Sequence, residues 1–244
     1  MKLEYMMTSD VQYAKEKNLP VVIPIGPIEW HGPHCALGCD TFVCKGLAEK
    51  LEENKEIVVC PPVWYGVASY AVGGPENGTV NIDVDVYEQY IYNILKSMVD
   101  GGFRNIYMLI HHQFEQENYM PMTLACAKAA KKLTMEYMEN TMGKGWWGSN
   151  SFSTYYENLG SSADPLNMIK VLSCMSKEVQ NATGYDHAGK YESSILKALY
   201  PDAVKLERLP ESDAWFVQSA YEASTELGMK MVELSLKDLN EKIK

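Results

Sequence analysis

Three short apolar runs constrain the fold of this chain more than any other feature. They cover residues 21–25, 57–60 and 106–110, and proline, glycine or polar residues follow each of them. Runs of this length and composition are typical of strands that are buried on both faces of a parallel sheet. Because segments with helical periodicity lie between the runs, the pattern predicts βαβ units and an α/β fold.

The helical periodicity is found in five segments. Apolar residues recur at helical spacing in 41–51, 86–99, about 119–132, 193–199 and about 215–239. Residues 133–138 are predicted to form a fourth strand, although a continuation of the preceding helix is the alternative. Residues 143–164 combine polar and aromatic side chains without a clear period. We therefore predict a long loop there, of the kind that often forms a lid or a binding loop.

Composition and charge exclude several classes of protein. Of the 244 residues, 46% are hydrophobic and 22% are charged, and no linker, repeat or low-complexity tract divides them, so we expect one domain over 1–244. A net charge of −10 opposes binding to nucleic acid, which requires clustered Lys and Arg. A membrane span is not expected either, because no run of about 18 apolar residues occurs. The six cysteines accompany no signal-peptide pattern, so we expect reduced thiols and a cytoplasmic location.

Candidate metal ligands follow the first apolar run directly. Glu29, His31 and Asp40 lie within a dozen residues, and carboxylate and imidazole groups suit zinc and manganese. Residues just beyond the carboxyl end of a strand line the ligand crevice of an α/β sheet. Each residue also has a simpler interpretation, such as Asp40 capping the next helix. Three of them in one loop nevertheless favour a metal site, in which the Asp40 carboxylate can bridge two ions.

Two further groups can contribute to such a site. His111 and His112 follow the third apolar run. Because successive residues of a strand point to opposite faces, we expect one of them to be a ligand and the other to be structural. His187 and Glu192 flank a glycine ahead of the segment 193–199. His187 is a candidate general acid or base, whereas Glu192 is either a ligand or a carboxylate that favours the helix dipole.

The segment 24–40 resembles the signature of the creatininase (creatinine amidohydrolase) family. It reads P-I-G-P-I-E-W-H-G-P-H and then L-G-C-D, where the family pattern is P-x-G-S-x-E-Q-H-G-P-H-L-P-L-x-T-D. Further matches are Tyr65-Gly66, G-T-V at 78–80, His112 where the family has N-G-H, and H-A-G with E-S-S between 187 and 194. The resemblance spans most of residues 19–204.

This resemblance implies a three-layer αβα sandwich with a mostly parallel central sheet, commonly assembled as a homo-hexamer. It also implies a site for two divalent ions, which are zinc, manganese or iron. Transferred by position, Glu29, Asp40 and His112 hold one ion, and His31 and Asp40 hold the second. Asp40 is then the bridge, and His187 carries a proton to the leaving group.

The chain departs from the family pattern after the third apolar run. Ile110 and His111 replace the Asn-Gly that usually precedes the ligand histidine, and Phe114 stands where creatininase has a metal-binding Glu. The last ligand of the second ion is therefore open between three carboxylates: Glu115, Glu117 and Glu192. We prefer Glu192, because the family motif around it is intact.

The resulting prediction is a metal-dependent hydrolase of a small cyclic substrate, such as a cyclic amide, that acts through a hydroxide bridging two ions. The residues predicted to bind the substrate are aromatic: Trp64, Tyr65, Trp146 and Trp147. Alternative activities are ring opening of a cyclic polyol ketone or lactone-like compound, formyl-amide hydrolysis, and ring opening or isomerisation at one ion. A catalytically silent, oligomeric binding protein is the alternative from another class.

Overall fold

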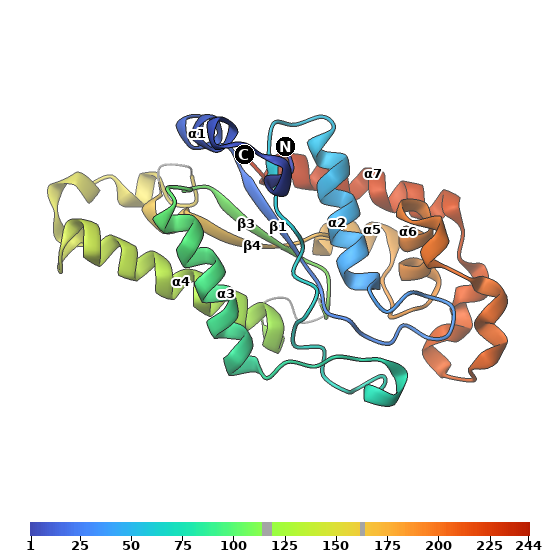
Figure 1. The fold of residues 1–244 in the computed structure, drawn as a ribbon. Coiled ribbons are helices and arrows are strands. Elements are labelled where there is room, and N and C mark those ends of the chain that lie inside the picture. The colour runs from blue at the N-terminus through green and yellow to red at the C-terminus, as the bar shows by residue number, and fades with distance from the viewer. Residues whose placement is uncertain (114–118, 162–163) are drawn as a thin grey trace.

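A four-stranded parallel sheet forms the centre of the protein (Figure 1). The computed structural model describes residues 1–113, 119–161 and 164–244. In the order β2-β1-β3-β4, the sheet contains β1 (Val21–Ile25), β2 (Val58–Val59), β3 (Ile106–Ile110) and β4 (Ile169–Ser173). Ile25 pairs with Ile110, which in turn pairs with Ser173. The carboxyl ends of β1, β3 and β4 therefore lie side by side at one edge of the sheet.

Helices cover both faces of this sheet (Figure 1). The first face carries α3 (Val84–Asp100) and α4 (Pro121–Met142). The second face carries α2 (Cys39–Glu52), α6 (Lys190–Leu199) and α7 (Thr225–Lys242). The three-layer αβα arrangement predicted from the sequence is thus confirmed.

Shorter helices complete the described chain. Two of them are α-helices, α1 (Thr8–Glu16) and α5 (Lys177–Thr183). The others are 3-10 helices: η1 (Leu3–Tyr5), η2 (Pro75–Asn77), η4 (Trp146–Gly148), η5 (Asn150–Phe152), η6 (Tyr155–Glu157), η7 (Pro165–Asn167), η8 (Pro201–Ala203), η9 (Leu206–Glu211) and η10 (Trp215–Glu222). None of the described helices pairs the length with the apolar composition that a bilayer crossing requires.

The strand residues alternate between two hydrophobic cores. Ile23 and Met108 belong to the core beneath α3 and α4. Val22 and Leu109 belong to the core on the side of α2, α6 and α7. Because successive strand residues point to opposite faces and both faces are covered, every position of β1 and β3 is buried. This double burial is the reason that the runs 21–25 and 106–110 are apolar throughout.

The segment predicted as a fourth strand is helical instead. Residues 133–138 belong to α4, which continues unbroken to Met142. Leu133 and Met138 are buried and their neighbours Lys132 and Glu139 are exposed, which is helical rather than alternating burial. The fourth strand is β4, which the sequence analysis missed because only Ile169 of its five residues is fully buried.

The predicted final helix is divided into two elements. Residues 215–222 form the 3-10 helix η10, and α7 begins only at Thr225. The break lies at Ser224, whose backbone is extended and whose hydroxyl accepts a hydrogen bond from the Leu227 amide. Serine at this position satisfies an amide that a new helix would otherwise leave free.

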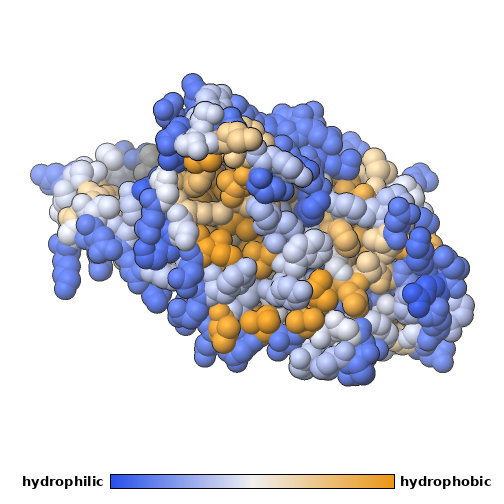
Figure 2. All heavy atoms as spheres, viewed as in Figure 1, coloured by the Kyte–Doolittle hydropathy of each residue, from blue (hydrophilic) through white to orange (hydrophobic). Residues whose placement is uncertain are grey.

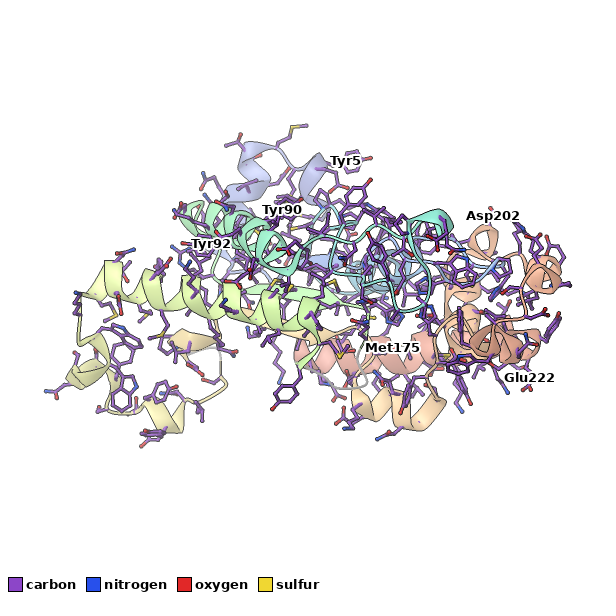
Figure 3. The ribbon with its side chains drawn as sticks, turned by 90° about the horizontal axis from the view of Figure 1, so that it is seen from below. Tyr5, Tyr90, Tyr92, Met175, Asp202 and Glu222 are labelled. Atoms are coloured by element: carbon purple, nitrogen blue, oxygen red, sulfur yellow. The ribbon has the colours of Figure 1, made fainter. Side chains whose placement is uncertain are left out.

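The predicted loop 143–164 contains only short 3-10 helices in its described part, 143–161 and 164. Gly143, with φ of 82°, ends α4. Trp146 is buried against Phe152, with 5.1 Å between the ring centroids. Figure 3 shows this segment beyond the far end of α4, at the opposite end of the molecule from α6 and α7.

Apolar side chains are also found on the surface. Figure 2 shows that they gather across the middle of one face, with hydrophilic side chains at both ends of the molecule. Exposed apolar and aromatic side chains of the segment 65–90 include Tyr65, Tyr70, Val86 and Tyr90. Exposed apolar surface of this kind is typical of protein contacts, so it is compatible with the predicted homo-oligomer, which stays a prediction.

A close contact between α6 and α7 gives a test of the packing. A Cβ atom added at Gly228 of α7 would collide with the backbone carbonyl of Ser194 in α6. We expect Gly228→Ala to lower the free energy of unfolding by about 1–3 kcal/mol, because the two helices must separate. Urea unfolding measures this effect. Gly148→Ala is the matched control, since a Cβ there meets nothing within 4 Å, and equal midpoints for the two variants would contradict the expectation.

Candidate metal centre

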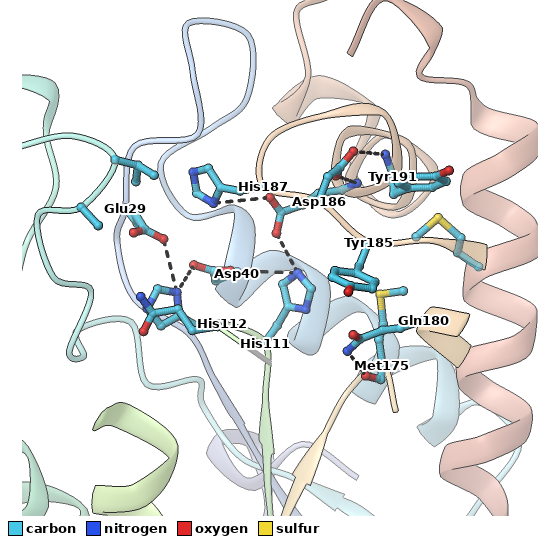
Figure 4. Close-up of a pocket in the computed structure, with 15 residues that line it drawn as sticks. Glu29, Asp40, His111, His112, Met175, Gln180, Tyr185, Asp186, His187 and Tyr191 are labelled. Atoms are coloured by element: carbon cyan, nitrogen blue, oxygen red, sulfur yellow. Dashed lines mark hydrogen bonds and ion pairs between the residues drawn. The ribbon is translucent and has the colours of Figure 1, made fainter. Parts of the chain in front are cut away.

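Buried carboxylates and imidazoles meet at the carboxyl edge of the sheet (Figure 4). Glu29 and His31 follow β1, and Asp40 lies in the first turn of α2. His112 follows β3, and Glu192 lies in the first turn of α6. All five are buried, with exposed fractions between 0% and 7%. The structure therefore brings together all five predicted metal ligands.

Asp40 is positioned by a close contact between α2 and the loop after β1. A Cβ at Gly26 would lie 2.5 Å from the Thr41 amide nitrogen, so only glycine permits this approach. The Thr41 hydroxyl then donates a hydrogen bond of 2.6 Å to the Gly26 carbonyl. These contacts hold the first turn of α2 beside the loop that carries Glu29 and His31.

The first group of ligand atoms surrounds His112. Its Nδ1 lies 3.3 Å from Glu29 Oε2 and 3.3 Å from Asp40 Oδ2. Ligands at about 2.0–2.1 Å from a tetrahedral zinc ion lie roughly 3.4 Å from one another. The observed separations match this value, so the three side chains have the spacing of a metal site.

The second group lies on the other side of Asp40. Its Oδ1 is 3.8 Å from His31 Nε2 and 4.0 Å from His111 Nε2. Glu192 approaches the same two imidazoles, with Oε2 3.4 Å from His31 Nε2 and Oε1 2.9 Å from His111 Nε2. Asp40 thus presents one oxygen to each group, which is the arrangement of a carboxylate that bridges two ions.

Unsatisfied polar atoms support this interpretation. His31 Nδ1 lies 2.9 Å from the Glu29 backbone carbonyl, to which only a protonated Nδ1 can donate, so Nε2 of the neutral ring carries the lone pair. Within the described residues, neither His31 Nε2 nor Asp40 Oδ2 has a hydrogen-bond partner, although both are buried. Buried polar atoms without a partner are costly, and a divalent cation beside each of these two atoms would remove that cost. The donor set therefore fits a metal ion.

The charges of the group shift the pKa values of its members. Burial alone would lower the pKa of His112, but the carboxylates of Asp40 and Glu29 outweigh burial and raise that pKa to about 10. The pKa of His31 is raised in the same way against burial, chiefly by Glu192 and Asp40. Burial favours the neutral form of Glu192, yet the adjacent His31 and His111 hold its pKa well below the usual value. The carboxylates thus attract positive charge, which metal ions can supply.

Glu192 is held by its own local structure. Asp186 accepts hydrogen bonds of 3.0 Å from the amides of Tyr191 and Glu192 at the start of α6. The amide of Ala188 donates to Glu192 Oε2 at 2.6 Å. Ala188 has a φ of 53°, a left-handed conformation that places this amide inside the turn. Asp186 was not predicted from the sequence, because its capping role depends on where the turn 186–189 folds.

His187 lies beside the ligand groups and lines the same pocket. Its Nε2 donates to the backbone carbonyl of Trp30 at 3.1 Å, while Nδ1 lies 4.0 Å from Glu192 Oε2. Its ring centroid is 4.4 Å from that of His31. Because its side chain is 26% exposed, His187 contacts both the buried carboxylate and the open pocket.

A pocket of about 170 Å³ opens beside the ligand groups, as far as the described residues define it. Besides the ligands, its lining includes side chains that the sequence analysis did not single out: Ala71, Val72, Gln113, Met175, Gln180, Tyr185, Asp186, Tyr191 and Met231. Met175 follows β4 within two residues and Gln180 lies in α5, the next helix, so missing that strand concealed both of them. The volume is below the roughly 300–1,000 Å³ of sites for drug-sized ligands, which favours a small ligand.

The two adjacent histidines differ from expectation. Only one of them was expected to point into the crevice, whereas His111 and His112 both line the pocket and both approach Asp40. Strand alternation does not apply to them, because β3 ends at Ile110. Gln113, with φ of 51°, continues this irregular turn. Phe114, Glu115 and Glu117, which also entered the ligand prediction, lie outside the described residues.

The four predicted substrate-binding residues do not line the described pocket. Trp64 packs edge-on against Phe42, and Tyr65 is 58% exposed. Trp146 and Trp147 lie beyond α4, which runs about 33 Å over its 22 residues away from the carboxyl edge. A strand at 133–138 would have returned the chain toward that edge, but the continuous helix carries the segment that follows it to the opposite end of the molecule (Figure 3).

The fold and the site define an α/β protein with a candidate two-ion metal centre at the carboxyl ends of parallel strands. Residues 4–239 match the creatininase family model, which is described as creatinine amidohydrolase. The chain therefore belongs to the creatininase family, and the resemblance inferred from its signature is confirmed.

Two curated relatives illustrate the range of the family. A 3-dehydro-scyllo-inosose hydrolase of Thermotoga maritima is 31% identical over 105 residues, which cover 43% of this chain and 32% of that protein. A creatinine amidohydrolase of Pseudomonas putida is 24% identical over 196 residues, which cover 78% of this chain and 67% of the relative. The match thus spans only about a third of the length of the first relative.

Solved structures share the fold over nearly the whole chain. A mutant creatininase superposes with a TM-score of 0.71 at 20% identity, with 99% of this chain and 98% of that chain covered. Two further structures, one named as a Zn-Zn type of mutant creatininase and one as creatininase Mn, each give a TM-score of 0.66 at 21% identity, with the same coverage. At these identities the likeness establishes the fold.

Proposed function

We propose that this protein is a metal-dependent hydrolase of a small substrate and that it works with two divalent ions. One observation carries the proposal: the two oxygens of Asp40 face two separate groups of ligand atoms, at 3.3 Å on one side and 3.8 Å on the other. Family membership supports it, because both curated relatives described above are named as hydrolases.

The ligand groups suggest which residues hold each ion. Glu29, Asp40 and His112, whose ligand atoms lie within 4.8 Å of one another, would hold the first. His31, Asp40 and Glu192 would hold the second, since His31 Nε2 lies 3.8 Å from Asp40 Oδ1 and 3.4 Å from Glu192 Oε2. Three carboxylates balance three of the four positive charges of two divalent cations. Mixed oxygen and nitrogen ligands accept zinc, manganese or iron, and the names of the similar creatininase structures include zinc and manganese.

Two such ions supply an activated water and polarise the carbonyl that is attacked. The protein itself contributes orientation and proton transfer. Because Nε2 of His187 is committed to the Trp30 carbonyl, its Nδ1 is the atom that can exchange a proton with the reacting groups. That nitrogen faces Glu192 and the pocket, so it can deliver a proton to the leaving nitrogen or oxygen.

The pocket supports a small, polar substrate. A cyclic amide is the first candidate, since the relative that covers most of this chain is a creatinine amidohydrolase. A cyclic polyol ketone is the second candidate, since the inosose hydrolase has the higher identity, 31%, over its shorter match. Gln180, Tyr185 and Gln113 in the lining can hydrogen-bond either kind of ring.

Metal analysis tests the proposal directly. We expect two zinc, manganese or iron ions per chain in the purified protein, and we expect chelator to remove both the ions and the turnover of a panel of cyclic amides and keto-polyols. Added metal should restore activity, because the ligands themselves are unchanged. A protein that binds no such ion and has no chelator-sensitive turnover on the panel would contradict the proposal.

A further inference from the structure

His111 contacts two of the proposed metal ligands but belongs to neither proposed ligand set. This residue stands where the family signature has glycine, so the family pattern gives it no role. Its Nε2 nevertheless lies 2.9 Å from Glu192 Oε1 and 4.0 Å from Asp40 Oδ1. Its imidazole therefore reaches the same two carboxylates as His31 from another element of the fold.

We infer that His111 is a fourth protein ligand of the second ion, together with His31, Asp40 and Glu192. This inference rests on the proposed function, because it presupposes that the second ion is bound. The four separations between imidazole nitrogens and carboxylate oxygens are 2.9, 3.4, 3.8 and 4.0 Å. These four of the six separations among the ligand atoms are distributed around the roughly 3.4 Å expected on a tetrahedral zinc ion, and the ligand atoms of Asp40, His111 and Glu192 all lie within 4.8 Å of one another.

The other side of the His111 ring is held in place by Cys174. The Cys174 sulfur lies 3.3 Å from His111 Nδ1, and the Cys174 amide donates to the Ile110 carbonyl at 2.9 Å. The ends of β3 and β4 thus fix the ring plane. When Nε2 binds a cation, Nδ1 carries the ring proton and donates it to the sulfur, which is the kind of outer contact that orients histidine ligands.

Cys39 is the competing candidate for the fourth ligand. Its sulfur lies within 4.8 Å of ligand atoms of His31 and Glu192. Its side chain is fully buried on α2, and a thiol binds metal only as the thiolate. His111 needs no such ionisation, because a neutral imidazole already carries a lone pair, so the chemistry favours His111.

The two ions then have different coordination. The second ion has two imidazoles and two carboxylates from the protein, whereas the first has only Glu29, Asp40 and His112. A closed set of four protein ligands is typical of structural zinc sites, and three ligands with an open position are typical of catalytic ones. Water and substrate would therefore bind at the first ion. Because the second ion has one more protein ligand, chelator would remove the first ion before the second.

Cobalt substitution of the whole protein tests this inference. Each metal-bound imidazole retains one ring N–H, which gives a strongly shifted, exchangeable proton resonance beside paramagnetic cobalt. We expect three such resonances in the wild-type protein, from His31, His111 and His112. His111→Ala should lose one of these resonances, while the first ion stays bound. It should also lower the affinity for the second ion by more than about 100-fold, since even residues that only contact a ligand contribute about 10–100-fold to metal affinity.

Cys174→Ser is the matched control, because it changes the contact to Nδ1 and leaves the ligand nitrogen intact. It should keep two cobalt ions and all three resonances. Two bound ions with only two imidazole resonances in the wild-type protein, or a thiolate-to-cobalt absorption band that Cys39→Ser abolishes, would overturn the inference and leave the proposed function standing. A wild-type protein that binds no ion would overturn both.

Discussion

Replacing Asp40 with Asn should abolish hydrolysis and reduce the bound metal from two ions per chain to at most one. The amide has one oxygen that can face a cation, and its NH₂ group cannot act as a ligand. Whichever way the side chain turns, either the Glu29–His112 group or the His31–Glu192 group loses its Asp40 oxygen. We expect turnover to fall by at least about 10³-fold, which corresponds to about 4 kcal/mol of activation free energy.

Metal content by mass spectrometry and turnover on the substrate panel measure the Asp40→Asn effect. Thermal unfolding adds a readout that is independent of catalysis. An ion that binds only the folded chain stabilises it by about 2.7 kcal/mol at 100 times its Kd, so added metal should raise the melting temperature of the wild-type protein more than that of the variant. Asp100→Asn is the matched control, because within the described part of the chain this exposed carboxylate pairs only with Lys96 across one helical turn.

The same variant separates the enzyme from a catalytically silent binding protein. If Asp40→Asn kept two ions, or if it left an observed turnover unchanged, Asp40 would not bridge a catalytic metal pair. A wild-type protein without metal and without turnover, whose assembly Asp40→Asn did not alter, would instead favour the silent binding protein.

The sequence predicted those strands that the fold buries on both faces. β1 and β3 are buried at every position, so their sequences are apolar throughout and could be recognised locally. β4 is only partly buried beyond Ile169, and its Lys170 reaches the side chains of Asn105 and Tyr107. A strand of that kind has no local signature, because its stability comes from pairing with β3.

The metal ligands could be predicted because a short signature holds most of them. Glu29, His31 and Asp40 lie within one loop and one helix start, where spacing along the chain fixes spacing in the fold. His111 and Asp186 could not be assigned in this way. The position of His111 beside Glu192 depends on how the chain leaves β3 and on where α6 begins, and neither is encoded in neighbouring residues alone.

The predicted place of two aromatic residues depended on the secondary structure of the segment before them. Trp146 and Trp147 were predicted to bind substrate because the polar and aromatic segment 143–164 was expected to form a lid or binding loop. The chain between 133 and 138 has apolar residues that satisfy a short strand and a helix equally well. Tertiary packing of α4 against α3 and β4 favours the helix. One secondary-structure assignment thus moves two aromatic side chains to the other end of the molecule.

Replacing His187 with Ala should lower kcat by about 10²–10⁴-fold and leave both ions bound. This is the usual contribution of a positioned general acid or base. The imidazole lies beside the ligands without belonging to either group around Asp40, since its closest carboxylate contact is 4.0 Å and its Nε2 is hydrogen-bonded to a backbone carbonyl. Metal content and the melting temperature should therefore match those of the wild-type protein.

The role of His187 as a proton carrier also predicts how the loss depends on the substrate. A leaving group that departs readily without protonation should react almost as fast with His187→Ala as with the wild-type protein, whereas a poor leaving group should show the full decrease. Imidazole in the buffer should restore part of the activity of His187→Ala, because the vacated space opens to the pocket. Loss of an ion together with activity would instead make His187 a ligand, as its proximity to Glu29 and His31 allows. An equal decrease for good and poor leaving groups would exclude proton delivery to the leaving group as its role.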